Sequence, residues 1–270
     1  MTTRAFSGAI RGGLSACVIA RDSEETLERC IESVRWADEC LVVLDDRTRD
    51  ASEEVAISAG ARVVRHRYEG NVEQKNFALT QLGSDWVLQL DADEALSDEL
   101  EASVREWLAG PASSFEGAEL NRVTLHLGRW LRHGDFHPDW QLRLFRRRTA
   151  QWSGQNPHGR VCLEGPVDRI EGDLEHRSYR DLADQVERVR EFSKLEANAM
   201  WLRGRRTKVT DLALRPAARF FRAYLLRAGF RDGVPGFLVA AITALHVLLK
   251  YASLRELELR LSGSSSNRRK

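Results

Sequence analysis

Carboxylates gather directly after two apolar runs of this 270-residue sequence. Asp91 and Asp93 follow the run VLQL, and Asp45 and Asp46 follow the run CLVVL. Two aspartates spaced one residue apart can hold a divalent cation directly or through water. Such oxygen ligands suit Mg²⁺ or Mn²⁺ bridging a diphosphate. Asp-x-Asp pairs are also common by chance, so the alternative is that Asp91 and Asp93 only cap a turn where a strand ends.

The elements that must position these carboxylates alternate between strands and helices. Strands are expected at 14–20, 40–44, 61–66 and 85–90, with helices at 22–34, 52–59 and 71–82. This alternation predicts right-handed crossovers and a mostly parallel sheet, hence an α/β fold. In such sheets ligands bind at the carboxyl ends of the strands, and both acidic clusters are expected at that edge.

The second half of the chain has a different pattern. After about residue 110 it consists of shorter pieces rich in Trp, His, Arg and Gly, which predict antiparallel strands and loops that extend the sheet and roof a cleft. A long helix is expected at 181–203, a cationic amphipathic helix at 215–230 and an apolar helix at 234–251. Residues 261–270 are expected to be disordered.

Charge is distributed unevenly along the chain. From Trp201 onward there are 15 Lys and Arg against 4 Asp and Glu, which leaves 26 of 41 basic and 36 of 40 acidic residues in the first 200. The basic segment predicts contact with an anionic partner, such as a phospholipid surface or a phosphorylated acceptor. Nucleic acid is not expected, because Phe and Leu stand between the arginines at helical spacing and no nucleic-acid-reading motif is present.

Compartment can also be inferred from the sequence. Cys17, Cys30, Cys40 and Cys162 lack paired spacing, which predicts reduced thiols and a cytosolic protein. The N-terminus has no apolar stretch long enough for a signal peptide, so export is not expected. The apolar run at 234–251 is just short of the about 20 residues that a spanning helix needs. We interpret it as a buried, interfacial or re-entrant helix.

Five motifs in the first 150 residues carry a family resemblance: LSACVIARDSEETLERCIESV, LVVLDDRTRDASEEVA, EQKNFAL, DWVLQLDADE and HPDWQLRLFRR. In this order and at these spacings they resemble the inverting family 2 glycosyltransferases, and most of all the lipopolysaccharide-core and related cell-envelope enzymes of Gram-negative bacteria. The later segments PHGRV, GDLEHRSYRDL and RPAARFFRAYLLRAGFRDGVPGF are similar to the C-terminal region of the same subgroup.

The resemblance implies a fold and a domain organisation. The fold would be the GT-A nucleotide-diphospho-sugar transferase fold, a Rossmann-like, mostly parallel sheet with a helical C-terminal extension. The catalytic domain would occupy residues 1–180, with a nucleotide-sugar half at about 14–110 and an acceptor half at about 111–180. A helical, basic amphipathic region would follow at 181–260, and then the disordered tail.

Roles for single residues also follow from the resemblance. Asp139 occupies the place of the carboxylate that deprotonates the acceptor hydroxyl, although it could equally be a structural residue before a strand. Asp93 is the expected direct metal ligand for Mn²⁺ or Mg²⁺, with Asp91 as a further candidate. His158 is a third candidate because of its position in a loop rather than through the resemblance, the alternative being a solvated or hydrogen-bonded loop histidine. The implied nucleotide-sugar side consists of Ala20, Asp22, Asp45, Asp46, Lys75, Asn76, Asp91, Ala92 and Asp93. On the acceptor side, Gln141 begins the strand behind Asp139. Trp140 could stack on a sugar ring, the alternative being a core tryptophan. His176 ends a loop that could return to the cleft, the alternative being a solvated or hydrogen-bonded loop histidine.

Two departures from the family pattern leave the nucleotide open. Asp22 is followed by Ser23 and Glu24 where the family usually has Asn-Glu, and Arg47 and Thr48 replace a small Gly-Ser pair. Arg47 could crowd the base pocket or bind phosphate.

The expected function is metal-dependent, inverting transfer of a sugar from a nucleotide-diphosphate donor, most commonly a UDP-sugar in the family, to a hydroxyl of a lipopolysaccharide-core or lipid-linked envelope glycan. The alternatives are a polyprenyl-phosphate sugar synthase and an inactive carbohydrate-binding or assembly protein at the membrane. A sugar nucleotidyltransferase is disfavoured, because the first strand is not followed by a Gly-rich loop. We expect a cytoplasmic protein that binds peripherally to the cytoplasmic face of the inner membrane through its C-terminal basic helices. A homo-oligomer is compatible with the sequence.

Overall fold

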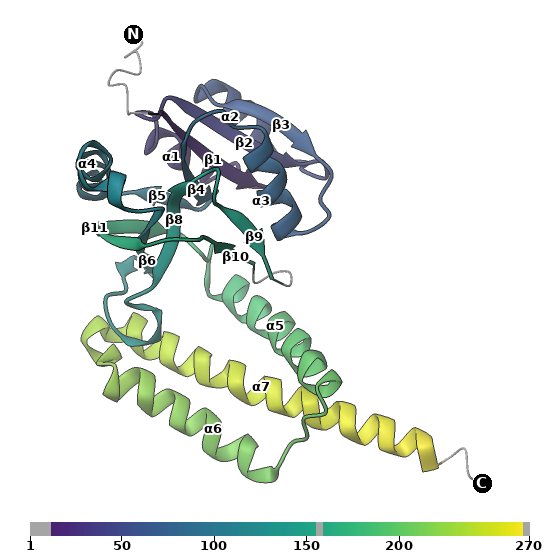
Figure 1. The fold of residues 1–270 in the computed structure, drawn as a ribbon. Coiled ribbons are helices and arrows are strands. Elements are labelled where there is room, and N and C mark those ends of the chain that lie inside the picture. Colours follow the sequence, from purple (N-terminus) through teal and green to yellow (C-terminus); the bar gives the residue numbers. More distant parts are fainter. Residues whose placement is uncertain (1–11, 155–158, 267–270) are drawn as a thin grey trace. The chain divides into compact units, whose positions relative to one another are not determined.

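The computed structural model describes residues 12–154 and 159–266, and the chain divides into two compact units (Figure 1). Unit 1 combines the chain up to Val123 with Asp139–Arg177, and unit 2 combines Thr124–Pro138 with the chain from Ser178 onward.

Unit 1 begins with four parallel strands in the order β3-β2-β1-β4. These are β1 (Leu14–Ala20), β2 (Glu39–Asp45), β3 (Arg62–His66) and β4 (Trp86–Asp91). The connecting helices are α1 (Leu27–Glu32), α2 (Ser52–Ser58) and α3 (Asn71–Thr80). The α/β fold and its parallel strands are therefore confirmed.

The sheet continues beyond β4 with antiparallel pairing. Next to β4 lies β8 (Trp140–Arg146), followed by β6 (Gly117–His126), β11 (Val167–His176) and β5 (Glu94–Leu96). A separate two-stranded sheet pairs β9 (Gln151–Ser153) with β10 (Arg160–Cys162). Helix α4 (Asp98–Ala109) and the short η1 (Pro111–Ser114) connect β5 to β6. The expectation of antiparallel strands after residue 110 is confirmed.

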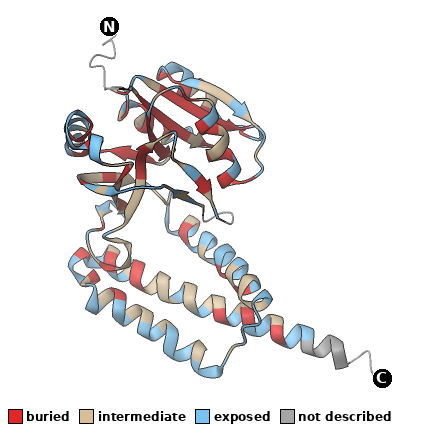
Figure 2. Ribbon diagram, in the orientation of Figure 1, coloured by how far each residue is buried: buried red, intermediate tan, exposed pale blue. Residues whose placement is uncertain are grey.

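Both faces of β1, β2 and β4 are buried, whereas β3 at the edge of the sheet is only partly buried (Figure 2). Along β1, Ala16 and Val18 face one apolar cluster, which includes Leu27 of α1, and Cys17 faces the other, which includes Leu79 of α3. Burial on both faces explains why these strands read as continuous apolar runs rather than as alternating patterns. Each fully buried large apolar side chain contributes about 1.5–3 kcal/mol.

The first helix is shorter than the sequence predicts. It was expected to begin at Asp22, but α1 begins at Leu27. Asp22 instead has a left-handed backbone (φ 46°), and its carboxylate accepts a hydrogen bond from the backbone N–H of Arg49 at 2.9 Å. The side chain thus joins the end of β1 to the loop after β2. It is therefore not used to cap α1.

Unit 2 consists of helices and a short arm. Its helices are α5 (Leu182–Leu202), α6 (Val209–Phe221), the π-helical η3 (Arg222–Leu226), η4 (Gly229–Asp232) and α7 (Gly233–Ser266). The arm, Thr124–Pro138, carries β7 (Arg129–Trp130), which pairs with the end of β6, and η2 (Gly134–Phe136). Helix α7 packs between α5 and α6 (Figure 1). The predicted helical C-terminal extension is confirmed.

Two C-terminal details differ from expectation. The helix expected at 215–230 begins earlier, at Val209. It does not continue to residue 230, because Ala228 has a left-handed backbone (φ 54°). Helix α7 continues to Ser266, so helix enters the segment that was expected to be a disordered tail. Among the described residues, one stretch, Gly229–Leu261, is long and apolar enough to cross a membrane by length and composition alone.

Candidate functional site

The Asp-x-Asp pair lies at the carboxyl edge of the parallel strands, as predicted. Asp91 is the last residue of β4 and pairs in register with Ile19 near the end of β1. Its Oδ1 accepts a hydrogen bond from Lys75 Nζ at 2.9 Å, and its Oδ2 accepts one from Arg143 at 2.6 Å. Burial raises the pKa of Asp91, but the charges of Arg143 and Lys75 outweigh this and hold it well below its usual range. Asp91 is therefore an ionised carboxylate anchored by two cations.

Asp93 has a different environment. It lies in the turn between β4 and β5, its side chain is 32% exposed, and its Oδ2 lies 3.4 Å from His176 Nε2. The structure thus brings two predicted site residues together, one on the turn and one at the end of β11. Ala92, between the two aspartates, is buried.

Glu94 explains how the turn is fixed. Its side chain is fully buried, and its Oε2 accepts a hydrogen bond from the backbone N–H of Asp91 at 3.1 Å. Its Oε1 accepts from Arg143 at 2.6 Å and from Arg122 at 3.1 Å. Glu94 therefore holds the backbone of the Asp-x-Asp turn and joins two arginines that the sequence reasoning did not single out.

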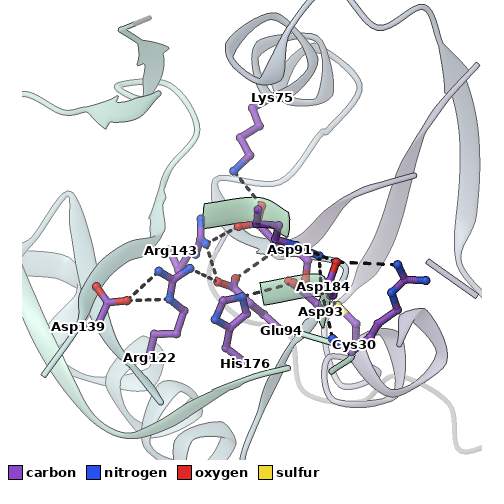
Figure 3. A network of polar contacts seen from close by, with 12 residues as sticks. Cys30, Lys75, Asp91, Asp93, Glu94, Arg122, Asp139, Arg143, His176 and Asp184 are labelled. Carbon is purple, nitrogen blue, oxygen red and sulfur yellow. Dashed lines mark hydrogen bonds and ion pairs between the residues drawn. The ribbon is translucent and has the colours of Figure 1, made fainter. Parts of the chain in front are cut away.

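Asp139 lies immediately before β8 and is bound by Arg122, the arginine that also contacts Glu94 (Figure 3). Its Oδ2 accepts hydrogen bonds from Arg122 Nε at 2.8 Å and lies 2.7 Å from Nη2, while its Oδ1 accepts from Gln141 Nε2 at 2.6 Å. An unbroken path of contacts therefore runs from the Asp-x-Asp turn to the candidate base. Its members, in order, are Lys75, Asp91, Arg143, Glu94, Arg122 and Asp139.

A signal for the two arginines is present in the sequence. Arg143 stands between Leu142 and Leu144 in β8, and a charge in a buried part of a strand requires a partner of opposite sign. Burial lowers the pKa of Arg143, but the charges of Asp91 and Glu94 outweigh it, so the guanidinium stays ionised. Arg122 follows the same rule on β6, where Glu94 and Asp139 raise its pKa against the effect of burial.

The end of β2 holds the second acidic cluster. Asp45 is buried, and its carboxylate accepts hydrogen bonds from Arg47 Nε at 3.0 Å and Nη2 at 2.6 Å. These bonds lower the pKa of Asp45. The guanidinium of Arg47 also lies 4.7 Å from the centre of the Tyr68 ring. Asp46 is exposed, so of the two aspartates it is the one open to a ligand.

Lys75 and Asn76 on α3 have separate roles. Lys75 is buried, lies 4.3 Å from the centre of the Trp152 ring and contacts Asp91. The side chain of Asn76 accepts a hydrogen bond from the Trp152 backbone N–H and donates one to its carbonyl, both at 2.9 Å. Asn76 therefore fastens β9 to α3, whereas Lys75 belongs to the carboxylate cluster.

The remaining predicted residues are placed as follows. Ala20 is buried at the end of β1, and the ring of Trp140 lies 4.8 Å from the guanidinium of Arg169. His158 lies outside the described residues.

The donor set fits a hard divalent cation that substrate phosphates also ligate. Asp93 supplies partly exposed carboxylate oxygens, and His176 supplies a nitrogen at the same turn. Both carboxylate oxygens of the neighbouring Asp91 are already paired, with Lys75 and Arg143. Across the described parts of the chain, no group of three or more His, Cys, Asp or Glu side chains forms a complete metal cage. Mg²⁺ commonly binds through one or two carboxylates together with substrate phosphates, rather than in a cage made only of protein.

Comparison with known proteins shows the family of the chain. The sequence profile described as "Glycosyl transferase family 2" matches residues 15–165. The lipopolysaccharide core biosynthesis glycosyltransferase LpsC of Rhizobium meliloti is 28% identical over 248 residues, covering 89% of this chain and 91% of that protein. An uncharacterized glycosyltransferase of Rickettsia typhi is 26% identical over 257 residues, covering 92% and 88%.

The chain is also similar to solved structures. Glucosyl-3-phosphoglycerate synthase from Mycobacterium tuberculosis in complex with Mg²⁺ and UDP is 18% identical, with a TM-score of 0.45 over 70% of this chain and 78% of that chain. Residues 1–349 of S. aureus TarS are 13% identical, with a TM-score of 0.47 over 93% of this chain and 92% of that chain.

Proposed function

The chain belongs to glycosyl transferase family 2 and is a glycosyltransferase, and we propose that it moves a sugar from a UDP-sugar to a hydroxyl of a lipopolysaccharide-core or lipid-linked envelope glycan, with inversion. The observation that carries this proposal is the contact path that joins the Asp-x-Asp turn to Asp139. It provides separate carboxylates for the leaving group and for the acceptor, which a single displacement requires.

Donor binding uses the edge of the parallel strands. The exposed Asp46 is the proposed partner of the base or ribose, because a carboxylate at a strand end can accept hydrogen bonds from sugar hydroxyls. Asp93 would hold Mn²⁺ or Mg²⁺ with His176 beside it, and Asp91 supports the turn while paired with Lys75 and Arg143. When bound, the cation would neutralise the charge that the leaving nucleoside diphosphate gains.

Acceptor activation is assigned to Asp139. Its carboxylate takes the proton of the acceptor hydroxyl as the new bond forms to the anomeric carbon and the bond to the diphosphate oxygen breaks. Arg122 and Gln141 each contact one carboxylate oxygen, so they fix the orientation of the group. Attack opposite the leaving diphosphate inverts the anomeric centre.

Nucleotide binding can be tested by thermal shift. A UDP-sugar with Mn²⁺ should raise the melting temperature more than either alone, because a ligand that binds only the folded state stabilises it. Asp93→Asn should remove the metal-dependent part of the shift. Asp168→Asn, a change on β11 of the same unit, serves as the matched control and should keep it. The donor assignment is wrong if no nucleotide-sugar gives a metal-dependent shift.

A polyprenyl-phosphate sugar synthase is the second candidate, since transfer to a phosphate needs no general base. Asp139→Asn should lower kcat about 10²- to 10⁴-fold if a hydroxyl is the acceptor, with the donor-induced thermal shift unchanged. Undiminished turnover would favour the phosphate acceptor. If the unaltered protein binds donor but neither transfers nor hydrolyses it, the third candidate, an inactive binding or assembly protein, is favoured.

The location we propose is the cytoplasmic face of the inner membrane. The basic C-terminal segment supports it, with 15 Lys and Arg against 4 Asp and Glu from Trp201 onward. A segment of this charge is attracted to anionic lipid at about 1 kcal/mol per basic residue near the surface. Lipid-linked and lipopolysaccharide-type acceptors are carried by the same membrane.

A further inference from the structure

Exposed apolar side chains gather at one turn of unit 2, between the end of α6 and the start of α7. This apolar turn comprises residues 221–237. Phe221 is 55% exposed, Leu225 51%, Leu226 83% and Phe230 51%. In Figure 2 this end of α6 is largely pale blue. A soluble surface rarely groups large apolar side chains so closely without a binding role.

Arginines stand between these apolar side chains. In residues 212–237 there are five arginines and one acidic residue, Asp232. Asp232 is buried, and its carboxylate accepts hydrogen bonds from the backbone N–H and the ring of His133. The charge that this segment presents to solvent is therefore entirely positive.

A buried carboxylate of the arm organises three of the arginines. Asp135, only 1% exposed, lies 2.8 Å from Arg219 Nε and 3.2 Å from Arg227 Nη1, and Arg222 Nη2 lies 3.9 Å away. One negative charge faces three positive charges, so the cluster keeps a net charge of about +2. Arg222 and Arg227 are 49% and 45% exposed, which leaves guanidinium donors available to an anion at the surface.

The turn is rigid. The rings of Phe220, Tyr224 and Phe237 pack on one another with centroid distances of 5.4–5.7 Å. Gly236 allows the start of α7 to approach η4 closely, because a Cβ at this position would lie 2.0 Å from the carbonyl oxygen of Gly229. The packed rings and this close approach join the end of α6 to the start of α7, so the backbone that carries the arginines and the apolar side chains has a defined course before any partner binds, which reduces the entropy lost on binding.

We propose that the apolar turn is the membrane-binding surface of the protein, with Phe221, Leu225, Leu226 and Phe230 inserted among the headgroups of a bilayer and Arg222 and Arg227 bound to phospholipid phosphates. This inference rests on the proposed membrane location and assigns it to a defined surface. Basic side chains alternating with large apolar ones are the composition of elements that lie in the bilayer interface.

A membrane-spanning helix and a contact between two copies of the turn fit the contacts of this region less well. Helix α7 carries polar contacts to α5 along its middle, where Lys250 Nζ lies 2.8 Å from Glu196 and the carbonyl of His246 accepts from Ser193 Oγ. It therefore forms part of a helical bundle rather than an isolated span. A second copy of the turn is also disfavoured, since the arginines of two copies would face each other.

The test is vesicle co-sedimentation of the full chain. Arg222→Gln with Arg227→Gln should weaken binding to vesicles containing phosphatidylglycerol about 30-fold, from about 1 kcal/mol per arginine, and leave binding to pure phosphatidylcholine unchanged. Leu225→Asn with Leu226→Asn should weaken binding to both kinds of vesicle. Leu202→Asn is the matched control, because Leu202 is 84% exposed on α5, as Leu226 is on η3. It should bind like the unaltered chain.

Hydrogen exchange of the unaltered protein tests the same surface without any variant. Anionic vesicles should protect the amides of residues 221–230 and not those of 195–203. Equal protection of both stretches, or an effect of Leu202→Asn equal to that of the Leu225/Leu226 pair, would overturn the proposal. So would vesicle binding by the Leu225/Leu226 variant equal to that of the unaltered chain. Donor hydrolysis without vesicles is measured separately, so a failure of the transferase assignment is distinguishable from a failure of the surface.

Discussion

At the scale of single residues, two buried arginines join the ends of the candidate site. Removing one partner of a buried ion pair leaves a charge without compensation in a medium of low dielectric constant. Arg143 contacts Asp91 and Glu94 within 2.6 Å, so its loss would leave two carboxylates without this guanidinium. The carboxylate pair and the arginines are thus interdependent, although they come from β4, β5, β6 and β8.

Arg143→Met should therefore destabilise the fold by about 3–5 kcal/mol, measured by chemical denaturation at pH 7. Adding Glu94→Gln should recover part of the loss, since Lys75 still compensates Asp91. Arg169→Met is the matched control: its guanidinium is 60% exposed and pairs with Glu119 on the surface, so the change should cost less than about 1 kcal/mol. Equal losses in the two single variants would contradict the role of the buried network.

Asp45 provides a pH test at the same scale. Hydrogen bonding to Arg47 lowers the pKa of Asp45, so the unfolded chain takes up this proton at a higher pH than the folded chain does. The stabilisation is present above the ordinary aspartate pKa of about 3.9 and is lost as pH falls through the lowered value. Arg47→Gln should thus reduce the free energy of unfolding at pH 6, and the difference from the unaltered chain should shrink below about pH 3. A difference independent of pH would refute this assignment.

At the scale of elements, the sequence predicts best what is buried on both faces. The strands β1, β2 and β4 are buried on both faces and begin and end within one residue of expectation, because continuous apolar runs must be covered on both sides. The partly buried edge strand β3 is also placed within one residue. Local patterns fail where a long-range contact decides the outcome. The bond from Asp22 to the loop after β2 delays α1, and the three-residue β5 exists only because it pairs with β11.

The candidate site likewise contains residues whose positions the local sequence pattern predicts and residues whose contacts depend on long-range pairing. The positions of Asp91 and Asp93 follow from a strand that must end at the sheet edge, so they are predictable from the run that precedes them. The contacts of Asp139 with Arg122, and of Arg122 with Glu94, depend on the register of β6 and β8, which no local pattern specifies. Arg143 was recognisable only as a charge between Leu142 and Leu144 in a strand.

At the scale of the whole molecule, a near-neutral net charge conceals two segments of opposite net charge. The first 200 residues carry 26 basic and 36 acidic residues, and the rest carry 15 and 4. An anionic membrane attracts the second group and repels the first, so the proposed membrane contact is expected in the C-terminal segment. This contact matters to an enzyme whose proposed acceptor is held in that membrane.

This polarity predicts a salt effect on transfer. Raising the ionic strength from about 0.1 to 1 M shortens the Debye length from about 10 to 3 Å, so binding to anionic vesicles and sugar transfer to a vesicle-borne acceptor should both fall. Donor hydrolysis without vesicles should change little, because the contacts of the buried site are screened far less than exposed charges. The measurement compares the two rates in the same salt series. If both fall together, salt acts on the catalytic site, and the proposed role of the basic segment in presenting the enzyme to its acceptor is wrong.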